Sequence, residues 1–285
     1  PLSLDILIVQ KVPCQFECVI FSYHVSFMKG NHYMGNSEVV DFISYNKSIT
    51  VIFDALGVAD ILASQSKILL KPNLINASPF PITTAPECCE VIVKYIQTCS
   101  KAEIVIGEGS GAPSVETGQV FKKLGYTELA ERYGVELVDL NHAPLQELHN
   151  KECFIFPTMF LPKIVFTHFL ISIPVLKVHS LAGFTGSLKN IIGLAPPSYY
   201  SGSHGSWKKA VFHGDMQQSI IDLTTYRTPD LTLMDASVGL SEFHLGGATC
   251  NPPIGKLVAG YDAKEVDRIS ADLLGLDWQD IKHLL

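Results

Sequence analysis

The sequence predicts an α/β protein with a mostly parallel β-sheet and helices flanking it. From residue 38 onward, short apolar runs alternate with longer segments that have a helical period. Glycine- and proline-rich loops separate these segments, as is typical of parallel strands joined by crossover helices. The segment 152–176 differs, because its short apolar runs are broken by Pro157, Pro162 and Pro174. The expected architecture is therefore a Rossmann-like βαβ alternation with a mixed middle segment.

In the first half of the chain, apolar runs bounded by loops predict strands at residues 39–44, 67–71, 103–107 and 135–140. The helical period between them predicts helices at residues 47–63, 86–99, 114–123 and 126–133. The clearest start is that of the second helix. Thr84 has Glu87 three residues later, and Pro86 lies in the first turn, which together are typical of a helix amino terminus.

In the second half, the segment 195–214 is rich in Gly, Ser, Pro and His. We expect it to be a functional loop, because loops of this length without regular structure usually are. Regular structure is expected to return with a helix at 215–226, strands at 231–235 and 257–259, and a helix at 263–274. Asp262 is expected to cap the last helix, with Asp267 as a charge in its first turn.

Residues 1–37 show no clean hydrophobic period, and the chain opens on proline. We expect this segment to be a loosely packed or non-native extension. Residues 38–285 are then expected to form a single α/β domain, with two lobes around 176–214 as the other arrangement.

The composition excludes several classes of function. The net charge of −7 and the scattered basic residues predict no nucleic-acid partner, because phosphate binding needs a basic stripe. The most apolar stretch, 160–176, is interrupted by proline, lysine and histidine, so no membrane partner is expected. Seven cysteines without a CxxC motif predict reduced thiols in a cytoplasmic protein.

Cationic and amide side chains follow two apolar segments and predict an anion site. They are Lys71, Asn73, Lys177, Lys189 and Asn190. A lysine at the mouth of an apolar strand is costly unless an anion meets it, and the ends of parallel strands gather at one edge of a sheet. We therefore expect these residues to bind a small carboxylated or phosphorylated metabolite. Residues 185–187 are expected to begin a helix whose free N–H groups add to the site.

Three residues are candidates for catalysis. If residues 176–180 are extended, Lys177 and His179 lie on the same side, and the cation lowers the histidine pKa. His179 is then expected to act as a general acid or base. Glu108 and Asp235, each at the end of a predicted strand, are expected to face the same crevice.

Three further patterns have alternative interpretations. The loop 107–112 fits G-x-G-x-x-A with Asp139 closing the next strand, which favours a dinucleotide turn, but Pro113 falls where the helix should open, which favours a plain tight turn. His204, His213 and Asp215 are candidate metal ligands. The pair 88–89 places two cysteines at a helix amino end, where the helix dipole lowers a thiol pKa, and at least one of them is expected to pack in the core.

Several motifs occur in the order of a known family. They are KPNL at 71–74, TTAP at 83–86, GEGSG at 107–111, VELVDLN at 135–141, ISIPVLKVH at 171–179, TGSLKNIIGL at 185–194, LTLMDASVG at 231–239 and AGYD at 259–262. On these motifs the chain resembles the domain of unknown function 362 family over about residues 38–285. The late aspartate motif of that family is retained only at Asp262 and Asp267.

The resemblance implies an association with iron–sulfur proteins, because some family members carry a ferredoxin-like cysteine module. This chain departs from that subgroup, since it has no CxxCxxC run. Three functions are therefore expected in order. The first is an enzyme acting on a small anionic metabolite. The second is a redox accessory protein that partners iron–sulfur or ferredoxin proteins, and the third is a metal or cofactor carrier.

Overall fold

The structure is a computed structural model that describes residues 37–202 and 204–285. The prediction for residues 1–37 lies outside these residues, apart from Ser37, which begins strand β1 (Ser37–Asp41). The described residues belong to one compact unit, and the segment 176–214 is part of it.

The central sheet is mostly parallel, as the sequence predicts. Its main path runs β1-β11-β10-β7-β2-β3-β4. Besides β1, these strands are β2 (Lys67–Pro72), β3 (Glu103–Glu108), β4 (Glu136–Asp139), β7 (Phe169–Ile173), β10 (Leu231–Leu240) and β11 (Lys256–Gly260). Strands β10, β7, β2, β3 and β4 pair in parallel. Strand β11 is antiparallel to both β10 and β1, so the sheet is mixed at that edge.

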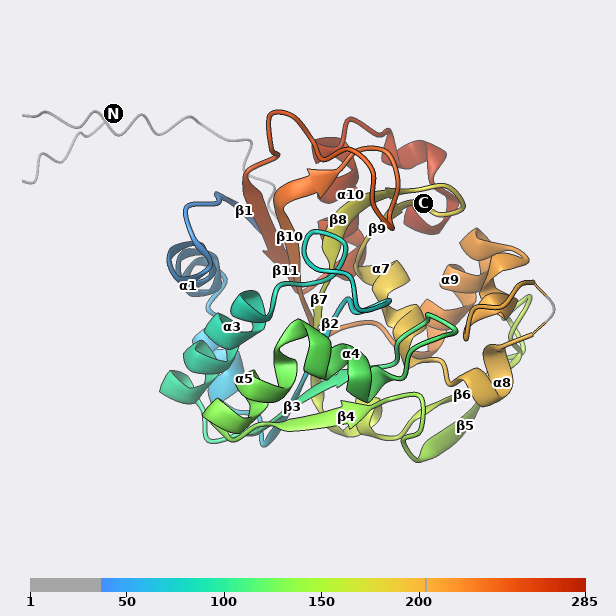
Figure 1. The fold of residues 1–285 in the computed structure, drawn as a ribbon, viewed down its shortest axis with the longest axis horizontal. Coiled ribbons are helices and arrows are strands. Elements are labelled where there is room, and N and C mark those ends of the chain that lie inside the picture. Colours follow the sequence, from blue (N-terminus) through green and yellow to red (C-terminus); the bar gives the residue numbers. More distant parts are fainter. Residues whose placement is uncertain (1–36, 203) are drawn as a thin grey trace, which may run out of the picture. The chain divides into compact units, whose positions relative to one another are not determined.

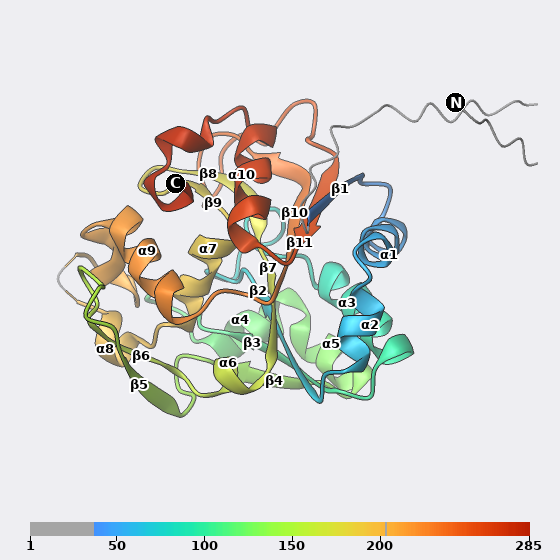
Figure 2. The same ribbon diagram turned by 180° about the vertical axis from the view of Figure 1, so that it is seen from behind.

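Helices cover both faces of the sheet (Figures 1 and 2). One face carries α1 (Tyr45–Ala55), α2 (Val58–Ala63), α3 (Pro86–Cys99), α4 (Thr117–Leu124) and α5 (Tyr126–Tyr133). The other carries α6 (Ile164–Thr167), α7 (Ser187–Asn190), α8 (Pro197–Tyr200), α9 (Met216–Tyr226) and α10 (Ala263–Leu273). The period of two in each strand divides the core accordingly. In β2, for example, Ile68 and Leu70 pack in the first layer and Leu69 in the second.

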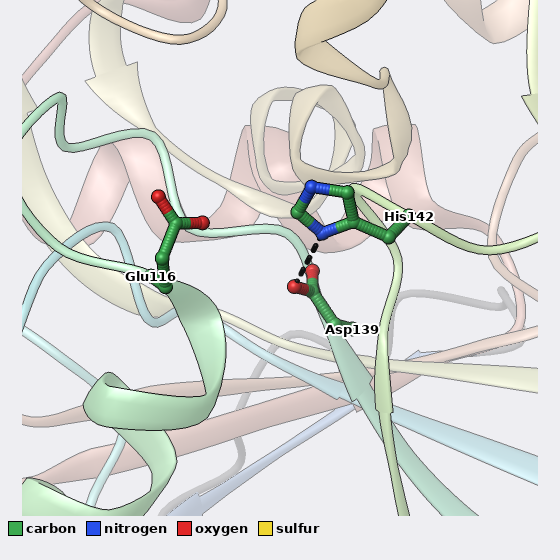
Figure 3. A group of neighbouring side chains, drawn as sticks. All are labelled: Glu116, Asp139 and His142. Carbon is green, nitrogen blue, oxygen red and sulfur yellow. Dashed lines mark hydrogen bonds and ion pairs between the residues drawn. The ribbon is translucent and has the colours of Figure 1, made fainter.

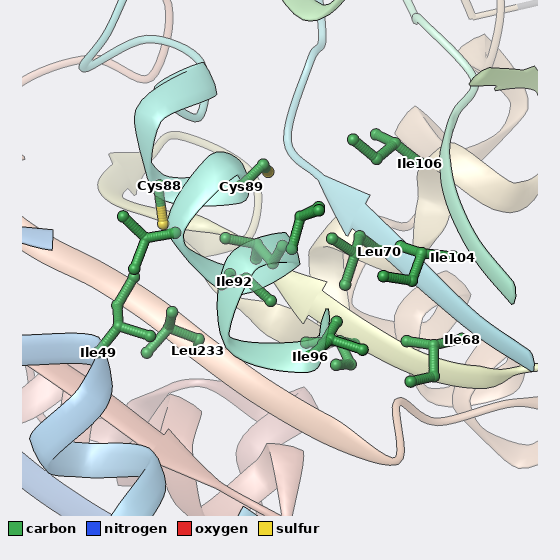
Figure 4. Packing of buried hydrophobic residues seen from close by; sticks show 14 of the residues in the cluster. Ile49, Ile68, Leu70, Cys88, Cys89, Ile92, Ile96, Ile104, Ile106 and Leu233 are labelled. Atoms are coloured by element: carbon green, nitrogen blue, oxygen red, sulfur yellow. The ribbon is translucent and has the colours of Figure 1, made fainter. Parts of the chain in front are cut away.

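Helix α3 shows how the first layer is packed (Figure 4). Its apolar stripe, which includes Ile92 and Ile96, lies against β2 and β3. Cys88 and Cys89 are both fully buried here. Burial raises the pKa of both thiols, that of Cys89 to about 12, so the lowered pKa expected from the helix dipole is wrong at this position. Both cysteines pack in the core.

The helix at 86–99 begins and ends where the sequence predicts, but its start differs in mechanism. Thr84 does not cap it, because Ala85 is the N-cap residue and no side chain accepts from the first turn. The Thr84 hydroxyl instead accepts from the Asn73 N–H at 2.8 Å and donates to the Ile173 carbonyl at 2.7 Å. Thr84 therefore joins the loop after β2 to the end of β7.

The remaining differences from the prediction are local. The helix expected over 47–63 is divided at Gly57, whose φ of +63° lies in the left-handed region. The middle segment forms a separate antiparallel pair, β5 (Leu145–His149) and β6 (Thr158–Pro162), and the predicted loop 195–214 contains two short helices. The other short elements are β8 (Val175–His179), β9 (Gly183–Thr185) and the 3-10 helices η1 (Ile191–Leu194), η2 (Ala210–His213), η3 (Trp278–Asp280) and η4 (Lys282–Leu284). Among the described helices, none has the length and apolar character needed to cross a membrane.

Candidate functional site

Two neighbouring cavities lie where the carboxyl ends of β2, β3 and β8 meet the loops after β9 and β10. We call the larger one, of about 230 Å³, the histidine cavity, because His179, His213 and His244 line it. The smaller one, of about 70 Å³, is called the Lys209 cavity. The two share six lining residues: Asn73, Ile75, Thr185, Lys189, Trp207 and His213. Ligand sites in α/β proteins commonly occur at this edge of the sheet.

Lys71 and Glu108 form a closed ion pair beside the cavities. Lys71 Nζ lies 2.8 Å from Glu108 Oε1 and also donates to the Pro72 carbonyl and to Asn190 Oδ1. These three bonds use all the donors of an ammonium group. Burial lowers the pKa of Lys71, and the Glu108 charge opposes that shift. The prediction that Lys71 binds substrate is therefore wrong.

Glu108 is held as tightly as its partner. Its Oε1 also accepts from the Gly109 N–H at 2.8 Å, and its Oε2 accepts from the Leu74 N–H at 2.9 Å. The carboxylate reaches the wall of the Lys209 cavity, but its oxygens are occupied by protein donors. The geometry thus gives Glu108 a structural role in place of the predicted catalytic one.

Asn190 and Asn73 connect this ion pair to Lys177. Asn190 Oδ1 accepts from Lys71 and from Asn73 Nδ2, while its Nδ2 donates to the Lys71 carbonyl and to Ser172 Oγ. Asn73 Oδ1 accepts from Lys177 Nζ at 2.8 Å. Both amides line the cavities, and they also position the lysines around them.

Lys177 is buried without a carboxylate partner among the described residues. Its Nζ donates to Asn73 Oδ1 and, at 2.7 Å, to the Ile82 carbonyl. One of its three donors is left for the cavity. Burial and the nearby Lys189 lower the Lys177 pKa to about 7.

Lys189 is half-buried, lines both cavities and has no hydrogen-bond or ion-pair partner within residues 37–202 and 204–285. Burial and the Lys71 charge lower its pKa to about 8. It projects from α7, whose first N–H groups were predicted to be free for an anion. That prediction is wrong, because Asp267 of α10 accepts from the Ser187 and Leu188 N–H groups at 2.6 and 2.9 Å. Burial raises the pKa of Asp267 to about 7.

His179 faces the cavity as a donor. Its Nδ1 accepts from the N–H groups of Leu181 and Ala182 at 3.1 and 3.2 Å, so the neutral ring carries its proton on Nε2. The ring lies on that of His244, with centroids 3.9 Å apart. Burial and Lys189 lower the His179 pKa, which is the direction expected from the sequence, although burial is the larger cause. With Nδ1 occupied, His179 is suited to donate a hydrogen bond and poorly suited to act as a base.

Several cavity residues were not found by sequence reasoning. Thr185 Oγ1 and His244 Nδ1 are buried and have no partner among the described residues. Lys209 Nζ donates to Asn141 Oδ1 at 2.7 Å and to the Ala195 carbonyl, and burial lowers its pKa to about 7. The only available signal was the long loop 195–214, which carries Lys209 and Trp207.

Asp235 is not part of the cavities, contrary to the prediction. It has the same parity in β10 as Leu233, which packs in the first core layer, so its side chain points toward α1. There it accepts from Tyr45 Oη at 2.7 Å and from the N–H and hydroxyl of Ser237. Burial raises the Asp235 pKa. The residue therefore links β10 to α1.

The predicted metal ligands do not assemble. Asp215 caps α9 by accepting from the Gln218 N–H, and His204 is exposed, while His213 faces the cavities. Within the described residues, the one group with metal-ligand spacing is Glu116, Asp139 and His142 (Figure 3). There His142 Nδ1 lies 2.8 Å from Asp139 Oδ2, and Lys208 lies 2.9 Å from Glu116.

Cysteines do not provide an iron–sulfur site in the described part of the chain. Its five cysteines are all free, and none joins the group with metal-ligand spacing. Cys88 and Cys89 are buried among apolar side chains, which does not fit the ligand set of a cluster. The redox-accessory and carrier functions thus gain no support from these residues.

The glycine loop after β3 is packed against protein. A Cβ atom on Gly109 would overlap the Gly193 carbonyl oxygen, so the two backbones touch. The N–H groups of Gly111 and Ala112 both donate to the Ile75 carbonyl, at 3.1 and 3.0 Å. These donors are not free for a pyrophosphate, which favours the tight-turn interpretation over the dinucleotide one.

The fold and these cavities define an α/β protein with a ligand-sized, lysine- and histidine-lined site at the carboxyl edge of its parallel strands. The chain belongs to the family described as domain of unknown function (DUF362), whose profile matches residues 68–272. This confirms the resemblance found in the sequence motifs.

Solved structures with a similar fold were also found. One is the lactate racemase apoprotein from Thermoanaerobacterium thermosaccharolyticum, with a TM-score of 0.47 and 13% identity over 84% of this chain and 56% of that chain. Another is a protein from Thermotoga maritima, with a TM-score of 0.45 and 13% identity over 78% of this chain and 57% of that chain. This chain thus spans little more than half the length of either. The search of curated proteins gave no significant match.

Proposed function

We propose that the chain is a cytosolic enzyme that binds a small carboxylated or phosphorylated metabolite in the histidine cavity. The observation that carries this proposal is the Lys189 ammonium, which lies at the junction of the two cavities without an acceptor in the described residues. A cation removed from water without a partner is costly, and a bound anion would offset that cost.

The surrounding donors support an anionic ligand. Lys189 offers three donors, Lys177 offers one, and His179 presents its Nε2–H. The Thr185 hydroxyl adds an unpartnered polar atom on the same wall. Charge-assisted hydrogen bonds from such groups are the usual way in which carboxylates and phosphates are held. The five free thiols agree with a reducing compartment.

Removing either cavity lysine is expected to weaken anion binding. Trp207 lines both cavities, so its fluorescence in a Trp278→Phe background reports on ligand binding. Titration with oxalate and with inorganic phosphate should show which class of anion is preferred. Lys189→Met and Lys177→Met should each raise Kd by about 10–100-fold, because a hydrogen bond to a charged group contributes about 1.5–3 kcal/mol.

The matched control is Lys122→Met, which removes an exposed lysine on α4. It should leave Kd unchanged. Unchanged affinity in both cavity variants, or no binding of any tested anion to the parent protein, would contradict the proposal.

Anion binding is also expected to weaken as the pH rises from about 6 to 9. Lys177 and Lys209, with pKa values of about 7, and Lys189, with a pKa of about 8, lose their charge in this range. The histidines of the cavity do not interfere, since burial lowers the pKa of His179, His213 and His244, the last to about 3. Oxalate stays doubly ionised throughout. Calorimetry in two buffers should show proton uptake on binding near pH 8, and a pH-independent Kd would argue against lysine charge as the binding force.

A further inference from the structure

The four buried or half-buried lysines of this region differ in what holds their protons. Lys71 is paired with Glu108 and has all three donors engaged. Lys177 and Lys209 each donate to two protein oxygens. Lys189 donates to none in the described residues. An acceptor stabilises the protonated form of an amine, so Lys189 is the lysine whose proton is held least by its neighbours.

We propose that Lys189 is a nucleophilic amine that forms an imine with the carbonyl carbon of a 2-oxo acid bound in the histidine cavity. This inference rests on the proposed function and extends it by naming a substrate class and a covalent step. A lysine becomes nucleophilic when it is desolvated or placed beside another cation. Both conditions hold for Lys189.

The charged and titratable groups around Lys189 come from several elements. Lys71 lies on β2, Lys177 and His179 on β8, His213 on η2, and His244 on the loop after β10. Glu108 on β3 is the carboxylate at this cavity wall, and Lys71 neutralises it. The surroundings of Lys189 are therefore cationic or neutral, which disfavours its ammonium form. The lowering of its pKa to about 8 agrees with this arrangement.

A 2-oxo acid fits because its carbonyl carbon is bonded directly to its carboxylate. With the carboxylate on Lys177 and the His179 Nε2–H, the carbonyl carbon is held toward Lys189, which lines the same cavity. The Lys189 lone pair then forms the C–N bond, and the carbonyl oxygen becomes a hydroxyl group. The two hydrogens of the neutral amine leave with that oxygen as one water molecule. The step therefore needs no oxidant or reductant. His213, which lines both cavities, is suited to pass the proton from nitrogen to oxygen.

The test is reductive trapping of the full chain with pyruvate and cyanoborohydride, followed by peptide mapping by mass spectrometry. Lys189 should carry the adduct at a level at least about tenfold above any other lysine, as expected for an activated amine. Lys189→Arg should lose the adduct while still binding oxalate, because the cation is retained, and Lys189→Met should lose both. Lys177→Met should slow trapping by weakening carboxylate binding.

Two further results separate this inference from the proposed function. From pH 6 to 8 the trapping rate at saturating pyruvate should rise as Lys189 loses its proton, while the affinity for oxalate falls. Oxalate binding with adducts spread over surface lysines, or equal labelling of the Lys189→Arg variant, would overturn the imine and leave the anion site intact. Absence of both trapping and anion binding would overturn the proposed function as well.

Discussion

Glu108→Gln is expected to lower the free energy of unfolding by about 3–5 kcal/mol, because it leaves the Lys71 ammonium buried without its counter-charge. Lys71 is fully buried, and Glu108 is only 2% exposed, so water cannot replace the lost carboxylate. Urea denaturation followed by circular dichroism measures the loss. A double substitution, Lys71→Met with Glu108→Leu, should cost less than the sum of the single substitutions, since neither charge is then left unpaired.

The same two strands provide a matched control. Lys67 and Glu103 pair across β2 and β3 at 3.4 Å, with side chains about half exposed. Glu103→Gln should change stability by about 0–1 kcal/mol, as exposed ion pairs do. Equal losses at the buried and exposed pairs would show that burial does not govern the contribution of the Lys71–Glu108 pair.

Asp267→Ala is expected to lower the free energy of unfolding by about 2–6 kcal/mol. The Asp267 carboxylate is fully buried and accepts from two N–H groups at the start of α7, and each donor left unsatisfied costs about 1–3 kcal/mol. Because α7 carries Lys189, the variant should also bind oxalate more weakly than the parent protein. Thermal unfolding and the Trp207 titration measure the two effects.

Asp262→Ala is the matched control on the same helix. Asp262 is exposed and caps α10 by accepting from the Lys264 and Glu265 N–H groups. Its loss should cost about 0.5–2 kcal/mol and leave oxalate binding unchanged. A parent-like affinity for oxalate in Asp267→Ala would show that this carboxylate does not position Lys189.

The part of the site that could be predicted from the sequence is the gathering of its lysines and amides. Lys71, Asn73, Lys177, Lys189 and Asn190 do lie around one pair of neighbouring cavities. This followed from their positions at the ends of strands and at the start of a helix, because parallel strands bring such ends to one edge. Their individual roles could not be predicted in the same way.

Asp235 and Asp267 show why. Both were recognisable as polar residues in apolar surroundings, but their partners are 190 and 80 residues away in sequence. The parity of Asp235 in β10 points it to α1, away from the cavities, and the docking of α10 on α7 turns Asp267 into a cap for another helix. No local pattern records either contact.

The sequence by itself determined the mostly parallel sheet, the two layers of helices and the edge where the site lies, because hydrophobic period and loop composition are local properties of the chain. The tertiary structure alone decided which lysine is free. Lys71 and Lys189 look alike as lysines in apolar segments, yet the packing of β3 beside β2 gives Lys71 a carboxylate, while Lys189 has no acceptor among the described residues. The charge state of a buried amine depends on the groups that surround it in space, and these come from distant parts of the chain.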